Sequence, residues 1–105
     1  MNNIQAKLVV QPPAFIDSVY QYQNVNKDIN LREKNTKFFH RKAIKWCSGK
    51  MCTYLESNKG HKFIYTLLRI FIRKYKINWF DLADNYEVVK DYIKMKLKSS
   101  EQFLS

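Results

Sequence analysis

The feature that most constrains the fold of this 105-residue chain is one amphipathic segment, residues 61–75. Its large apolar side chains recur at the i, i+3, i+4 and i+7 positions that share one side of a helix. Its cations fall on the opposite side. The pattern predicts a helix at the centre of a hydrophobic core, with a basic ridge on its back. The apolar residues are Phe63, Ile64, Leu67, Leu68, Phe71, Ile72 and Tyr75, and the ridge consists of Lys62, Arg69, Arg73 and Lys76.

Two helices are predicted before this segment. Asn30 is a favourable N-cap, and Glu33 three residues later completes a pattern similar to a capping box. A helix is therefore expected from there to about Trp46. Along it the apolar residues Phe39, Ala43, Trp46 and Cys47 recur at helical spacing. The Ser-Gly pair at residues 48–49 ends it, and residues 50–57 then predict a short helix with one apolar face.

Two asparagines mark further helix starts after the central segment. Asn78 is predicted to cap a short helical stretch in which Asp81 lies near the positive end of the helix dipole. Asn85 is predicted to cap a last helix from Tyr86 to about Lys98, whose lysine-rich end suits the negative end of the dipole.

Together these segments predict an all-α fold. The length allows one domain, and only two Gly and two Pro argue against a β fold built on many tight turns. We expect a compact bundle of three to five short helices over residues 30–98, preceded by an extended N-terminal arm, residues 1–29. The last residues, 99–105, are expected to fray.

The arm carries large apolar residues but too few of them to form a core of its own. It is therefore expected to dock, either on its own domain or on a neighbouring protein subunit. The residues predicted to make that contact are Val9, Val10, Phe15, Ile16, Val19 and Tyr20.

Positive charge is concentrated in the middle of the chain. The net charge is +10, but residues 32–76 carry thirteen Lys and Arg against two acids, whereas the segments before and after are neutral or slightly acidic. Charge segregated in this way attracts phosphates, anionic lipid or an acidic protein surface. The alternative is that lysines only keep the exposed helix faces soluble.

The sequence predicts an intracellular, non-secreted protein. Its first residues lack the basic and apolar regions of a signal peptide. Its longest nearly uncharged apolar stretch, residues 63–72, contains Arg69 and is too short to span a bilayer.

No catalytic, cofactor or metal site is predicted. The sequence has no Gly-rich phosphate loop, nucleophile elbow or zinc-protease motif. The cysteines, Cys47 and Cys52, could join His40 and His61 at a zinc ion, but their spacing matches no zinc finger. A disulfide is the second alternative, and reduced thiols at the edge of the core are the expected state.

A second row of cations is predicted on the helix after Asn30. Phe38 falls within this row, away from the apolar face. Cations interleaved with an aromatic side chain can neutralise phosphates and stack on a base; alternatively, Phe38 packs against another helix or the arm. The residues of both rows predicted to bind a polyanion are Lys34, Lys37, Phe38, Arg41, Lys42, Lys45, Lys62, Arg69, Arg73 and Lys76.

Residues 60–97 resemble a segment of small basic proteins of nucleocytoplasmic large DNA viruses. The resemblance rests on Lys59-Gly60-His61 before the aliphatic helix, on Asn78-Trp79-Phe80-Asp81-Leu82, and on Val89-Lys90-Asp91-Tyr92. It implies a component of a virion, or of a viral factory in the host cytoplasm, and it transfers no functional residues.

Two non-catalytic functions follow from these observations. In the first, the chain is a structural subunit of a large assembly such as a virus particle, with the arm and the basic face contacting other protein subunits. In the second, it binds DNA or RNA through phosphates without sequence preference. Sequence-specific DNA recognition by a helix-turn-helix motif is a weaker alternative, because residues 61–75 are too apolar for an exposed recognition helix.

Overall fold

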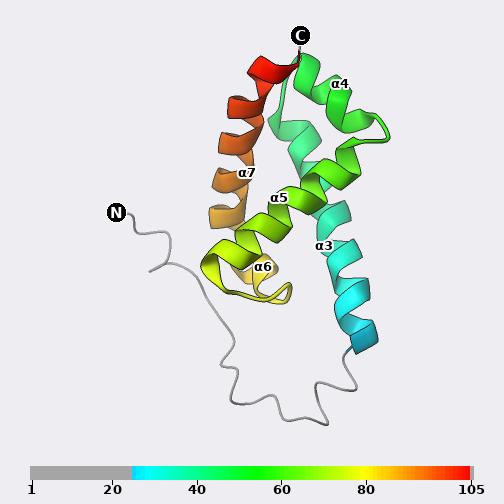
Figure 1. The fold of residues 1–105 in the computed structure, drawn as a ribbon, viewed down its shortest axis with the longest axis vertical. Coiled ribbons are helices and arrows are strands. Elements are labelled where there is room, and N and C mark those ends of the chain that lie inside the picture. Colours follow the sequence, from blue (N-terminus) through cyan, green and yellow to red (C-terminus); the bar gives the residue numbers. More distant parts are fainter. Residues whose placement is uncertain (1–24, 105) are drawn as a thin grey trace.

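The computed structural model describes residues 25–104, which form helices joined by short turns (Figure 1). These residues contain no β-strand, so the predicted all-α fold is confirmed. Most of the arm, residues 1–24, lies outside the described residues. The helices are α3 (Val25–Trp46), α4 (Lys50–Glu56), α5 (Gly60–Tyr75), α6 (Asp81–Asp84) and α7 (Tyr86–Ser100), followed by the 3-10 helix η2 (Glu101–Phe103).

Three long helices make the body of the bundle. Figure 1 shows α5 crossing α3 and lying between α3 and α7, and each pair of these helices is in contact. The short helix α4 packs on α3 and α5, and α6 lies at the opposite end of the bundle from it. No helix in the described part of the chain combines the length and apolarity needed to cross a membrane.

The core forms where the apolar face of α5 meets its neighbours, as the spacing in residues 61–75 predicts. Each large apolar side chain removed from water contributes about 1.5–3 kcal/mol, so this cluster dominates the stability of the bundle. Phe63, Ile72 and Tyr75 lie half-buried at its edge. Its buried members are Phe39, Ala43, Met51, Leu55, Ile64, Leu67, Leu68, Phe71, Ile77, Leu82, Val89, Tyr92, Ile93 and Leu97.

The first long helix starts earlier than the capping pattern predicts. α3 begins at Val25, and Asn30 is an exposed residue inside it rather than its N-cap. An asparagine inside a helix costs only a few tenths of a kcal/mol relative to the best helix formers, and residues 25–30 contain no Gly or Pro that would stop the helix. The last five residues of the predicted arm, residues 25–29, therefore belong to α3.

The two predicted asparagine caps make different contacts from those expected. The Asn78 backbone N–H donates to the carboxylate of the buried Asp81 at 2.8 Å. The side chain that forms the hydrogen bond at this turn is therefore that of Asp81, and the group it binds is the backbone of Asn78. Asn85 precedes α7 as predicted, and its carbonyl accepts the Val89 N–H, but its side chain donates to the Asp81 carbonyl at 2.6 Å. These bonds fix the turn between α5 and α7.

The C-terminal tail also differs from the prediction. Residues 99–105 are predicted to fray, but in the described part of this tail, residues 99–104, α7 continues through Ser100 and η2 follows it. Leu104 is half-buried and packs against the core. Its apolar contact provides a physical reason for the last turns to remain ordered.

The hydroxyl of Tyr92 predicts an unusual mutational effect. The residue is 5% exposed, and its Oη is buried with no hydrogen-bond partner among the described residues. An unpaired buried hydroxyl costs about 1–3 kcal/mol, so Tyr92→Phe is expected to raise the free energy of unfolding by about 1 kcal/mol. Urea denaturation followed by circular dichroism at neutral pH measures the difference.

The same substitution has a pH signature. Burial, with a smaller effect from Tyr75, raises the pKa of Tyr92 above its ordinary value of 10.0. Above that pH the unfolded chain releases the proton more readily than the folded one, so stability falls, and Tyr92→Phe removes this part of the fall. Tyr65→Phe, at a half-buried tyrosine, is the control with an expected change below about 0.5 kcal/mol. A Tyr92→Phe variant less stable than this control contradicts the prediction.

Candidate functional site

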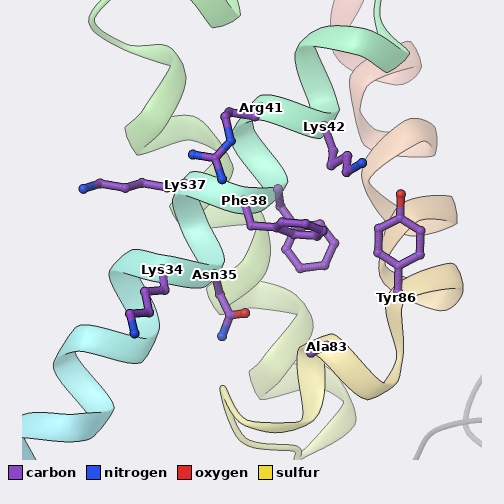
Figure 2. A pocket seen from close by; sticks show the side chains of 9 residues that line it. Lys34, Asn35, Lys37, Phe38, Arg41, Lys42, Ala83 and Tyr86 are labelled. Carbon is purple, nitrogen blue, oxygen red and sulfur yellow. The ribbon is translucent and has the colours of Figure 1, made fainter.

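A groove of about 800 Å³ lies between α3 and the segment formed by α6 and the start of α7 (Figure 2). α3 forms one side of it, and two residues of α6 and α7 form the other. We refer to it as the α3 groove. Its lining residues are Lys34, Asn35, Lys37, Phe38, Phe39, Arg41, Lys42, Ala83 and Tyr86.

The position of α3 in the bundle explains why these side chains are available. Phe39 and Ala43 are fully buried and define the face of α3 that meets the core. Lys34, Lys37 and Arg41 follow one another at spacings of three and four residues, so they lie on the opposite face and are exposed. Figure 2 shows them projecting from the outer side of α3, while Phe38 and Lys42 extend toward α7.

An aromatic cluster forms the base of the groove. Phe38 meets Phe39 edge-on, with ring centroids 5.1 Å apart, and meets Tyr86 at 6.0 Å. Phe39 stacks on Tyr86, and Trp46 contacts the same tyrosine edge-on at 6.2 Å. Phe38 is nevertheless 37% exposed. Both expectations for Phe38 therefore hold in part, because it packs against the bundle and also presents an aromatic surface to solvent.

The electrostatic character of the groove is positive. Lys42 Nζ lies 5.5 Å from the centroid of the Phe38 ring, within range of a cation–π interaction. The other three cations are exposed, and the groove lining in the described part of the chain includes no acidic residue. Four cations without a lining carboxylate create a field that favours an anionic ligand.

The structure gathers half of the predicted polyanion-binding residues into this groove and leaves the others elsewhere. Lys34, Lys37, Phe38, Arg41 and Lys42 line it. Lys45 is exposed further along α3 but does not line the groove.

The basic ridge of the central helix does not contribute to the groove. Lys62, Arg69 and Arg73 are exposed on α5, on the side opposite its buried residues. None of them lines the α3 groove. The structure therefore does not gather the two rows of cations into this one site.

Lys76 is not part of that helical ridge. α5 ends at Tyr75, and Lys76 adopts the left-handed conformation (φ 54°) that often ends a helix. Its N–H donates to the Ile72 carbonyl. Arg73 and Lys74 lie in the last turn of α5, where positive charge interacts favourably with the helix dipole.

Four groove residues are absent from the site predicted from sequence, and one of them, Phe39, was expected only in the core. Asn35 is buried, and its side-chain amide donates to the Trp79 carbonyl at 2.8 Å, which ties α3 to the turn after α5. Ala83 and Tyr86 reach the groove from α6 and α7. No periodic signal links residues 83–86 to α3, because only the folding back of the chain brings them together.

The cysteines are free thiols at the edge of the core, as expected. Both Sγ atoms hydrogen-bond to the Ile44 carbonyl oxygen, at 3.3 Å from Cys47 and 3.5 Å from Cys52. Burial and the neighbouring Cys52 raise the pKa of Cys47 to about 12, so this thiol stays protonated at neutral pH. Among residues 25–104, no three His, Cys, Asp or Glu side chains are grouped so that they could hold a metal ion.

Comparison of the chain with protein-family models, with curated proteins and with solved structures finds no match. The α3 groove is therefore interpreted from its own geometry and charge.

Proposed function

We propose that this protein is a non-catalytic binding protein whose α3 groove holds the phosphate backbone of a nucleic acid without reading its sequence. The observation that carries the proposal is that Lys34, Lys37, Arg41 and Lys42 all line one groove whose described lining contains no carboxylate. Contacts from cations to phosphates position a nucleic acid but carry no direct information about its bases.

The number of cations predicts the strength of the salt dependence. Each phosphate that is neutralised releases condensed counterions, so four contacts give a slope of log K against log salt of about −3 to −4. Affinity then falls by about 50- to 150-fold between 50 and 200 mM salt. A slope near zero would contradict the proposal.

Charge reversal in the groove is expected to abolish most of this binding. We expect the double variant Lys37→Glu/Arg41→Glu to bind a fluorescently labelled oligonucleotide about 100-fold more weakly at low salt, because two phosphate contacts become repulsions. Fluorescence anisotropy measures the affinity. Both residues are exposed, so circular dichroism should show an unchanged fold.

The back of α5 provides a matched control. Arg69→Glu/Arg73→Glu makes the same change in net charge at two exposed residues that do not line the groove. Its affinity is expected to fall by no more than about 5-fold, through the long-range field alone. Equal losses in the two double variants would indicate binding by net charge rather than by the groove.

The second candidate function is a structural subunit of a large assembly, such as a virion or a viral factory component in the host cytoplasm. The exposed apolar side chains of Met95 (58%) and Phe103 (77%) at the C-terminal end favour contacts with another protein. The resemblance of residues 60–97 to viral proteins supports the same role. The arm residues predicted to contact a neighbouring subunit lie outside the described residues. Binding to polyglutamate but to no oligonucleotide would favour this function.

A further inference from the structure

We infer that the ligand of the α3 groove is single-stranded nucleic acid, with an unpaired base stacked on Phe38. The inference rests on the proposed function and adds to it the strandedness of the ligand and the residue that detects it. The inference is carried by the floor of the groove, which is aromatic, whereas the exposed side of the groove is cationic.

The exposed aromatic surface distinguishes single strands from duplexes. In a duplex the faces of the bases are stacked on one another, so a protein meets mainly phosphates and base edges. In a single strand each base offers an open face, and aromatic side chains are the usual stacking surface for it. Phe38 is 37% exposed and lies in a groove that cations line. A duplex would contact only the cations of this groove, whereas a single strand could also stack a base on Phe38.

The arrangement of the side chains matches the two parts of a nucleotide. Figure 2 shows Lys34, Lys37 and Arg41 along the outer side of α3, and Phe38 directed to the other side, toward Tyr86. A strand whose phosphates follow the three cations would turn its bases toward Phe38. Lys42 Nζ, 5.5 Å from the Phe38 ring, adds positive charge beside the stacking position.

Phe38 is also held in place before any ligand binds. Its contacts with Phe39 at 5.1 Å and Tyr86 at 6.0 Å brace the ring from two directions, so little side-chain entropy is lost on stacking. Across the groove, Ala83 presents only a methyl group. The volume of about 800 Å³ lies within the range of pockets that enclose small organic molecules, so a base and its sugar fit.

The test compares ligands that share phosphates but differ in their bases. Anisotropy titrations at low salt use labelled strands of about 15 nucleotides: oligo-dT, oligo-U, an abasic strand with the same phosphates, and a duplex. Oligo-dT and oligo-U are expected to bind about 10-fold more tightly than the abasic strand and the duplex. A preference between oligo-dT and oligo-U would identify the source as DNA or RNA.

Phe38→Ala is expected to lower the affinity for oligo-dT by about 10-fold. The salt slope should stay the same as in the unsubstituted protein, and the affinity for the abasic strand should change by no more than about 2-fold, because no cation is removed. Phe38→Trp should restore the affinity, since a larger ring still stacks. Phe80→Ala is the matched control, because Phe80 is 39% exposed and does not line the groove.

The outcomes separate this inference from the proposed function. Equal affinity for oligo-dT, duplex and abasic strand, or an equal effect of Phe38→Ala on all of them, overturns base stacking but leaves phosphate binding intact. Binding to no nucleic acid at low salt overturns both, and binding to polyglutamate alone assigns the groove to an acidic protein. Base-dependent binding that is lost in Phe38→Ala and regained in Phe38→Trp supports the inference.

Discussion

Replacing Gly60 with alanine is expected to lower the free energy of unfolding by at least about 3 kcal/mol. A Cβ atom at this buried position would overlap the Leu55 carbonyl oxygen and lie 2.6 Å from the Leu55 Cα. These are backbone atoms, so no side chain can rotate to relieve the overlap. The gain in helix propensity from glycine to alanine, about 1 kcal/mol, is too small to offset it.

The turn between α4 and α5 is also held on several sides. The Gly60 N–H donates to the Ser57 carbonyl at 3.1 Å. His40 Nε2, on α3, donates to the Leu55 carbonyl oxygen at 2.6 Å. A shift of this turn that made room for a methyl group would therefore strain a hydrogen bond within the turn and the hydrogen bond that joins it to α3.

Gly49 is the control for the effect of glycine conformation alone. It has a φ of +58°, but a Cβ there would meet no atom within 4 Å. Gly49→Ala is therefore expected to cost only the strain of a backbone conformation (φ 58°, ψ −132°) that other residues rarely adopt, about 1–3 kcal/mol. Urea denaturation of both variants tests the contrast. A urea midpoint of Gly60→Ala no lower than that of Gly49→Ala would show that the turn between α4 and α5 rearranges to accept the methyl group, and would contradict the prediction.

Phe39→Ala is expected to destabilise the protein by about 3–5 kcal/mol and to disrupt the aromatic floor of the groove. Phe39 is fully buried, it stacks on Tyr86 at 6.0 Å, and it contacts Phe38 edge-on. Its removal leaves a cavity beneath the groove and removes the support of Phe38. A domain of this size is stable by only about 5–10 kcal/mol, so a large part of its stability depends on this one ring.

The neighbouring phenylalanine is the natural comparison. Phe38→Ala removes a ring that is 37% exposed, so a loss below about 1.5 kcal/mol is expected. Phe39→Leu, which keeps most of the buried volume, should fall between the two. Denaturant midpoints and oligonucleotide affinity are measured on all three variants. Equal destabilisation by Phe38→Ala and Phe39→Ala would contradict the separation into a core residue and a groove residue.

These two residues also show what sequence can predict about the site. They are adjacent, yet the helical period assigns Phe39 to the apolar face of α3 and Phe38 to the basic row, and the structure agrees. The same period predicts the buried side of α5. Helix ends were harder to predict, because a pattern such as Asn30 with Glu33 is compatible both with a helix start and with the interior of a longer helix.

The sequence by itself determined the all-α class, the central helix and the composition of each helix face, because these depend on interactions within a few residues along the chain. Only the tertiary structure decided which faces meet. It left the basic residues of α5 outside the groove that the cations of α3 line, and it brought Ala83 and Tyr86 into that groove with Phe38. The physical reason is that helix packing depends on contacts between residues distant in sequence, and no local period encodes them.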